Sequence, residues 1–299
     1  MEKVIRDSIS QQPYDLIIAS QLSMASYYSC FEEIPALFEE LEIGLFHDKV
    51  VRSTNLSKRI RHNLTWLKLR RYLSELIKSF QMCTVVSSEE RKLFEQHFPE
   101  SKTKVEIVPN GINCSDYLDL NIEPEPNQII FSGPFRYHVN YEAMVWFIQE
   151  IFPKILKRLP DTQLVITGDH ANLPLPTQEN ITLTGFVPDV KPLVASSWVS
   201  IAPLLSGGGT RLKILEAMAS GTPVVATSKG AQGLDIVPEK HILIADEPDI
   251  FANHVVRILK NKDLHDRLSA NALQVAEEKY DWNALIPHFL QVVEKASLH

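Results

Sequence analysis

The stretch 204–227, "LLSGGGTRLKILEAMASGTPVVAT", joins three successive glycines to a helical pattern and then to a short run of β-branched residues. The helical part is apolar nearly all round, which predicts a buried helix over 209–220. One acid, Glu216, interrupts its apolar run. A glycine-rich loop between a strand and a helix, with another strand close behind, is typical of a parallel α/β sheet.

The rest of the second half repeats this alternation. Several of its expected strands are continuous Val, Ile and Leu runs, which is the pattern of parallel strands covered on both faces. Strands are expected at 128–133, 163–168, 181–186, 198–203, 223–227 and 241–245. Helices are expected near 140–158, 189–196, 209–220, 248–261, 263–279 and 282–296.

The first half is predicted to alternate in the same way. Its strands are expected at 14–20, 43–47, 82–88 and 104–111, and its helices at 31–42, at 56–81 and at 88–98 with Ser88 as the cap. The proline- and acid-rich segment 118–128 is predicted to be the linker between domains.

These patterns predict two doubly wound, Rossmann-like α/β domains facing a cleft. The expected domains are 1–118 and 119–280, and the C-terminal helix 281–299 is expected to pack back toward the first. A complete nucleotide-type domain has two βαβαβ halves, whereas the first domain offers only four strands. We therefore expect the first domain to be incomplete at its front.

Composition narrows the class of protein. The chain has 299 residues, 30 Lys and Arg, and 37 Asp and Glu, and its net charge of −7 does not predict general nucleic-acid binding. Cys30, Cys83 and Cys114 are widely spaced without a CxxC pair, which argues against a disulfide framework or zinc site. The sequence shows neither a membrane-spanning apolar run nor a signal peptide. A soluble, cytoplasmic protein is expected.

The glycine stretch is suited to binding an anion. Glycines without a Cβ let backbone N–H groups approach a ligand closely, and a helix N-terminus adds unpaired donors and partial positive charge. The residues expected to contribute are Gly207, Gly208 and Gly209, the helix cap Thr210, and the cations Arg211 and Lys213. Phosphate is the expected anion, and a plain flexible loop is the alternative.

Glu216 extends this hypothesis from a phosphate to a nucleotide. A carboxylate in a buried helix needs polar partners. The two hydroxyls of a ribose could supply them, and phosphate at the helix start with ribose one or two turns on would match a nucleoside diphosphate. A structural ion pair is the alternative for Glu216.

The segment 206–234, "SGGGTRLKILEAMASGTPVVATSKGAQGL", resembles the donor-binding segment of the family 4 retaining glycosyltransferases, which have the GT-B fold. The resemblance covers 128–260, where "FSGPFRYHVNYEAMVWFIQEIFPKI", "LVITGD" and "LTGFVPDV" follow in the family's order. "CTVVSSEE" and "VEIVPNGIN" resemble the end of its N-terminal domain.

This resemblance assigns donor-site roles to several residues. Glu216 matches the second glutamate of the family's E-x7-E motif, which binds the donor ribose. The first glutamate falls at Gly208, so the resemblance implies that the sugar is contacted by backbone N–H groups at Gly208, Gly209 and Thr210. Arg136 and Lys213 are the candidates for the basic pair on the diphosphate, with Arg211 beside them. An exposed loop cation is the alternative for Arg136.

Further site residues follow from the same resemblance. Gly133 ends the strand before the loop of Arg136, and Phe186 and Val187 belong to the "GFVPDV" loop that contacts the base. "GLFHD" resembles a strand end that places His47 near the transferring sugar, and Asp48 is the candidate for an acceptor hydroxyl. A purely structural histidine is the alternative for His47.

The implied reaction transfers a hexosyl group from a nucleotide-diphosphate sugar to an acceptor with retention at the anomeric carbon. Positioning and electrostatic stabilisation of the leaving diphosphate would carry it, without a metal ion, a cofactor or a dedicated nucleophile. A glycan or lipid-linked acceptor, and a role in polysaccharide biosynthesis, are expected. The alternatives are a nucleotide-sugar-binding protein without activity and a nucleotide-sugar epimerase of similar fold.

Residues 49–72 contain eight Lys and Arg and no Asp or Glu. Trp66 and several leucines interleave with these charges, as in a helix that lies on an anionic membrane surface. The alternative is a solvated helix whose apolar side packs on the sheet. Peripheral contact with a membrane through 49–72 is therefore a second expectation.

Overall fold

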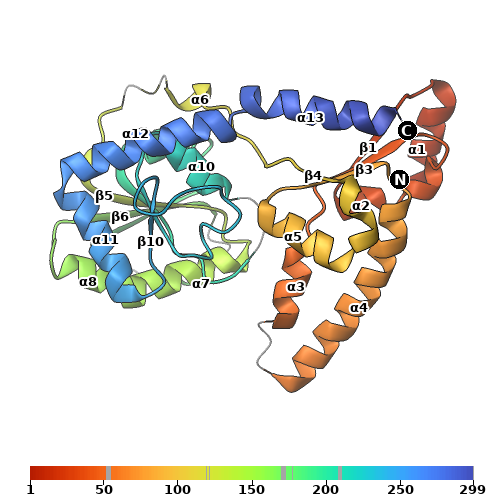
Figure 1. Cartoon of the computed structure of the whole chain (residues 1–299). Coiled ribbons are helices and arrows are strands. Elements are labelled where there is room, and N and C mark those ends of the chain that lie inside the picture. The colour runs from red at the N-terminus through yellow and green to blue at the C-terminus, as the bar shows by residue number, and fades with distance from the viewer. Residues whose placement is uncertain are drawn as a thin grey trace. The chain divides into compact units, whose positions relative to one another are not determined.

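The structure is a computed structural model of the chain (Figure 1). It describes residues 1–51, 55–118, 120, 122–169, 173–176, 178–207 and 211–298, without the side chains of residues 45, 48, 49, 51 and 118. Contacts divide the chain into two units. The first contains residues 1–110 and the C-terminal residues from Leu285 on, and the second contains residues 111–207 and 211–284.

The first unit has a four-stranded parallel sheet in the order β1-β2-β3-β4. Its strands are β1 Ile17–Ser20, β2 Ala36–Glu39, β3 Met82–Val85 and β4 Val105–Ile107. Its helices are α1 Glu2–Gln11, α2 Gln21–Ala25, α3 Gly44–Val51, α4 Leu56–Lys78 and α5 Ser88–His97, with the short 3-10 turns η1 Tyr28–Cys30 and η2 Pro99–Lys104. Buried aromatic rings, among them Phe38, Phe80 and Phe94, fill the core between helices and sheet.

Most of α13 Trp282–Ser297 belongs to the first unit. Val292 and Ala296 pack against Leu37 and Met82 of the sheet, and the ring of His288 lies 3.1 Å from the carbonyl of Ile107 through Nε2. The predicted domain boundaries at 118/119 and 280/281 stay predictions.

Two predictions in the first unit are wrong. The segment 31–42, predicted as a helix, contains β2, and 43–47, predicted as a strand, begins α3. The cause is tertiary. The Glu90 carboxylate of α5 accepts the backbone N–H of Ile43 at 3.0 Å and that of Gly44 at 3.1 Å, so it caps the start of α3. A residue 46 positions away leaves no trace in a local pattern.

Two smaller predictions also need correction. The cap of α5 is Ser87, whose hydroxyl accepts the N–H of Glu90 at 3.2 Å, and not Ser88. The predicted linker 118–128 ends too late, because β5 begins at Glu125. The helix predicted over 56–81 is confirmed as α4, and the helix α1 was not predicted.

The second unit has a six-stranded parallel sheet in the order β10-β9-β8-β5-β6-β7. Its strands are β5 Glu125–Ser132, β6 Gln163–Thr167, β7 Ile181–Gly185, β8 Ser197–Ala202, β9 Val224–Ala226 and β10 Leu243–Ile244. Its helices are α6 Ser115–Leu118, α7 His138–Trp146, α8 Phe152–Leu156, α9 Lys191–Ala195, α10 Leu212–Ala219, α11 Pro248–Lys260 and α12 Lys262–Lys279, and the π-turn η3 Phe147–Ile151 joins α7 to α8. All six predicted strands are confirmed.

Helices cover both faces of this sheet (Figure 1). Ile129 and Phe131 of β5 point into a core with α7, α8 and α11, whereas Ile130 between them points into a second core with α10 and the end of α12. The inner strands therefore need apolar residues on both sides, which is why continuous Val and Ile runs predicted them correctly.

The Glu90 cap yields a test of the first unit. Glu90→Ala leaves two backbone N–H groups at the start of α3 without their acceptor, and we expect it to lower the free energy of unfolding by about 1–2 kcal/mol. Glu89→Ala, the exposed neighbour in the first turn of α5, is the matched control and should cost less. Urea denaturation measures both variants, and equal losses would contradict the capping role.

Candidate functional site

The strand order of the second unit fixes where a ligand can bind. Numbered along the chain, the six strands follow the order 3-2-1-4-5-6, with β5 and β8 as the central pair. The connection after β5 leads toward one edge of the sheet, to β6, whereas the connection after β8 leads toward the opposite edge, to β9. In such sheets the ligand crevice lies beyond the carboxyl ends of the strands at this switch point.

Three residues meet at this point. Lys213 Nζ donates to Asn140 Oδ1 at 3.0 Å, and Asn140 Nδ2 donates to the carbonyl of Pro134 at 2.8 Å. Gly133, directly after β5, lies so close that a Cβ on it would stand 2.8 Å from Lys213 Nζ. Its φ of +154° adds strain for any side chain. A side chain at position 133 would therefore have to displace the lysine amine from its present place.

Burial makes Lys213 an unusual lysine. Its amine lies 3.9 Å from the centre of the Phe131 ring. Its pKa is lowered from 10.5 to about 7, chiefly by burial, with Glu216 opposing the shift and Arg211 adding to it. An ammonium has three donors, and among the described residues only Asn140 accepts one of them. The group is thus poised to gain charge when an anion arrives.

Glu216 lies one turn further along α10 and is half-buried. Burial raises the pKa of its carboxyl group, while Lys213 and Lys191 lower it. Within the part of the chain that the structure describes, its carboxylate makes no hydrogen bond. The alternative of a structural ion pair finds no partner within 4.0 Å there.

Arg211 is buried beside two loops. It is 6% exposed, and Nη2 donates to the carbonyls of Gly207 and Lys229, both at 3.1 Å. The guanidinium therefore ties the loop before α10 to the loop after β9, and its donor-site role stays a prediction. Gly207 itself has a φ of +101°, which suits glycine.

The middle of the glycine stretch lies outside the described residues. This applies to Gly208, Gly209 and Thr210, so their predicted backbone contacts stay predictions. The predicted helix 209–220 is observed as α10 from Leu212, with Arg211 at its N-cap position.

Arg136 follows strand β5, and the "GFVPDV" loop follows strand β7, as expected. Arg136 is exposed in the turn after β5, with its guanidinium 5.8 Å from the centre of the Tyr137 ring. Phe186, directly after β7, is 76% exposed, and Val187 is half-buried. All three stand at the carboxyl edge of the sheet, but their roles stay predictions.

The structure corrects the setting of His47. It is not at a strand end but inside α3, where its ring lies 5.7 Å from that of Trp66 on α4 and 5.5 Å from that of His97 on α5. The strand-like pattern of 43–47 misplaced it, because the cap from Glu90 turns this segment into a helix. The side chain of Asp48 lies outside the described part of the structure.

Sequence reasoning missed two groups of residues. The first is Asn140 and Phe131, which hold the Lys213 amine. An asparagine at the start of the predicted helix 140–158 was the only signal for it. The sequence held no signal for Phe131, because a phenylalanine in an apolar strand is typical of any core residue.

The second missed group lies at the carboxyl edge of the first unit. The Glu40 carboxylate accepts Gln21 Nε2 and Asn110 Nδ2, both at 3.0 Å. These residues follow β2, β1 and β4. Gln21 and Glu40 have φ values of +63° and +56°, a strained conformation that is enriched at functional sites.

Helix α4 carries a stripe of exposed apolar side chains. Trp66, Leu73, Leu76 and Ile77 are buried against the unit, but four others spaced at i, i+4, i+8 and i+11 are 54–72% exposed: Leu56, Ile60, Leu64 and Leu67. The alternative in which the apolar side packs on the sheet accounts for the first set only. Of the helices that the structure describes, none is long and apolar enough to cross a membrane.

Known sequences resemble parts of the chain. Residues 126–261 match the family "Glycosyl transferases group 1". An uncharacterized 44.6 kDa protein in the cps region of Klebsiella pneumoniae is 26% identical over 164 residues, which are 51% of this chain and 42% of that protein. The phosphatidyl-myo-inositol mannosyltransferase of Mycobacterium tuberculosis is 28% identical over 204 residues, which cover 62% of this chain and 53% of that protein. The chain spans about half the length of these curated relatives.

Solved structures resemble the whole chain. A glycosyltransferase from Rickettsia africae superposes with a TM-score of 0.74 at 15% identity, covering 99% of this chain and 80% of that one. The Anabaena protein HepE in complex with UDP-glucose superposes with a TM-score of 0.68 at 15% identity, covering 100% of this chain and 82% of that one. The chain has the GT-B fold. The predicted fold class is thereby confirmed, while family 4 membership and retention of configuration stay predictions.

The pKa of Lys213 yields a test of this site. The folded state disfavours its charged form, so its unfavourable contribution to stability is largest below pH 7 and is relieved as pH rises from about 7 toward 10.5. We expect Lys213→Met to raise the unfolding temperature at pH 6 and the gain to shrink by pH 9.

Lys154→Met is the matched control, because Lys154 lies on α8 in an ion pair with Asp249 at 2.7 Å. It should show no such gain at pH 6. Differential scanning calorimetry at both pH values decides the question. A Lys213→Met variant whose change in unfolding temperature does not depend on pH would refute the lowered pKa.

Proposed function

We propose that the protein is a glycosyltransferase that uses a nucleotide-diphosphate sugar. The observation that carries this is the half-buried Lys213 amine at the switch point, with Gly133 cleared of a Cβ beside it. A diphosphate placed there would meet a cation with unused donors and a low local dielectric, in which charge stabilisation is strong. The match of 126–261 to group 1 glycosyl transferases supports the same activity.

Two residues of α10, one helical turn apart, divide the recognition of the donor. Lys213 would neutralise the diphosphate as it leaves, and Arg136 on its exposed turn could add a second charge. Glu216 would accept the ribose hydroxyls, for which a half-buried carboxylate without a hydrogen bond to the described residues is suited. Hexosyl transfer with retention is proposed from the resemblance of this segment to retaining enzymes.

The acceptor is proposed to bind the carboxyl edge of the first unit. Glu40 is better supported there than His47, because its carboxylate stands at strand ends and is oriented by two amide donors. A carboxylate so fixed can accept a hydroxyl group. A glycan or lipid-linked acceptor is in keeping with the relatives' names, one a cps-region protein and one a phosphatidyl-myo-inositol mannosyltransferase.

Two alternatives predict different products. A binding protein without activity would leave the donor intact, and an epimerase would change the sugar without releasing nucleotide. Release of nucleoside diphosphate that rises with added acceptor separates transfer from both.

Nucleotide binding is tested by thermal shift with UDP, GDP, ADP and dTDP. We expect at least one nucleotide, with UDP the first candidate, to stabilise the wild type by about 2.7 kcal/mol at a hundredfold excess over its Kd. Glu216→Gln and Lys213→Gln should each abolish most of this shift. A wild type that no nucleotide stabilises would overturn the donor site.

Glu40→Gln serves as the matched carboxylate control in the first unit. It should keep the full nucleotide shift while lowering acceptor-dependent nucleotide release with glycerol, inositol and glucose as probes. A loss of nucleotide binding in this variant would place Glu40 in the donor site or in the core instead.

We also propose that α4 contacts an anionic membrane surface. Six Lys and Arg and no acid lie between residues 56 and 72, and they flank the exposed apolar stripe. Apolar side chains could enter the interface while the cations remain at the headgroups. This arrangement would bring the enzyme to a lipid-linked acceptor.

Vesicle co-sedimentation tests the membrane contact. Phosphatidylglycerol vesicles should bind the wild type at low salt, and binding should fall as salt rises. Leu64→Gln with Leu67→Gln should weaken binding by about tenfold or more, because each buried leucine contributes about 1.5–3 kcal/mol. The pair Ile286→Gln and Leu290→Gln on α13, 45% and 52% exposed, is the matched control. Absence of binding at low salt would refute the contact.

A further inference from the structure

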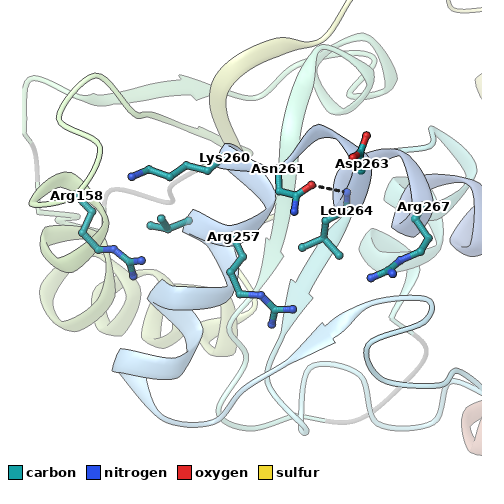
Figure 2. Close-up of a pocket in the computed structure, with 8 residues that line it drawn as sticks. Arg158, Arg257, Lys260, Asn261, Asp263, Leu264 and Arg267 are labelled. Carbon is teal, nitrogen blue, oxygen red and sulfur yellow. Dashed lines mark hydrogen bonds between the residues drawn. The ribbon is translucent and has the colours of Figure 1, made fainter.

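A cavity of about 620 Å³ lies in the second unit between the end of α8, the end of α11 and the start of α12 (Figure 2). Its floor includes Val256 and Leu264, both buried. Four cations stand around this apolar floor: Arg158, Arg257, Lys260 and Arg267. The volume is within the range of small-molecule sites.

The charges of the cavity are not balanced. Arg257 forms an ion pair with Glu239 at 3.2 Å, and Arg158 Nη1 donates to the neutral side chain of Asn253 at 3.1 Å. Neither Lys260 nor Arg267 forms an ion pair within 4.0 Å among the residues that the structure describes. Asp263 is the single acid of the lining. In a chain of net charge −7, this is a local excess of positive charge.

The start of α12 contributes to the same cavity. Asn261 Oδ1 accepts the N–H of Leu264 at 2.9 Å, the bond drawn in Figure 2, and so fixes the first turn of this 18-residue helix. A helix start carries partial positive charge, which adds to that of Arg267 one turn on. The planar guanidinium group of arginine can donate two parallel hydrogen bonds to phosphate oxygens, and three of the four cations are arginines.

The cavity is separate from the donor site. α7 begins beside the switch point, and the helical run from His138 to Leu156 crosses the sheet to end near Arg158 (Figure 1). Nineteen residues at 1.5 Å each correspond to roughly 28 Å. Arg158 thus lies on the amino side of the sheet, where β6 and β8 begin.

We propose that this cavity binds a small molecule that carries a phosphate or diphosphate group. Phosphate oxygens would contact Arg158, Lys260 and Arg267, and Asp263 would accept a hydroxyl of the same ligand. The apolar floor would exclude water beneath it, which strengthens the charge contacts.

Calorimetric titration with inorganic pyrophosphate as the probe tests the site. Because the donor site could also bind this probe, the titration is made on wild type, on Lys213→Gln and on the double variant Arg158→Gln with Arg267→Gln. We expect the double variant to lose about tenfold or more in affinity at one site, and Lys213→Gln to keep that site.

The control removes two exposed cations that do not line the cavity, Lys157→Gln with Lys240→Gln, and should bind as the wild type does. Thermal unfolding confirms that each variant is folded. The proposal is overturned if the arginine variant binds like the wild type, if the control pair loses as much affinity, or if Lys213→Gln removes all binding. The last result would assign the probe to the donor site alone.

Discussion

The amine of Lys213 is held half-buried at the point where the strand order reverses, between the parallel strands β5 and β8, and the candidate site is arranged around it. A lysine in this position loses hydration, and burial brings its pKa to about 7. Asn140 and the Phe131 ring hold the amine, and Gly133 leaves the space that it occupies. The free protein thus holds a poorly solvated amine that loses its charge as pH rises through about 7, and a bound diphosphate would favour the charged form.

The topology of the sheet explains why the Lys213 amine is buried at this edge. Parallel strands with helices on both faces bring the loops after β5, β6 and β8 to one edge of the sheet. The loop after β6 contacts the loop after β5 closely, because a Cβ on Gly168 would stand 2.1 Å from the carbonyl oxygen of Gly133. Arg211 anchors the loop after β8 through the carbonyl of Gly207. The site is therefore supported by the sheet edge and not by one loop.

The sequence predicted most of the second unit because its signals are local. Continuous apolar runs identify strands buried on both faces, and the glycine stretch with Glu216 identified the helix α10. What it missed depends on contacts between distant residues. Glu90 caps α3 from 46 positions away, Asn140 orients Lys213 from 73 positions away, and Glu40 meets Asn110 from 70. Contacts between such distant residues leave no periodic pattern in the sequence. His47 was therefore predicted at a strand end, and no role was predicted for Glu40.

Proton uptake on nucleotide binding tests the central claim most directly. If a diphosphate binds beside Lys213, it should raise the pKa of an amine that is mostly neutral at pH 8 in the free protein. Titration of UDP in buffers of different ionisation enthalpy should then show uptake approaching one proton at pH 8, little uptake at pH 6, and none at pH 8 in Lys213→Met. Binding of UDP at pH 8 without proton uptake would contradict the account.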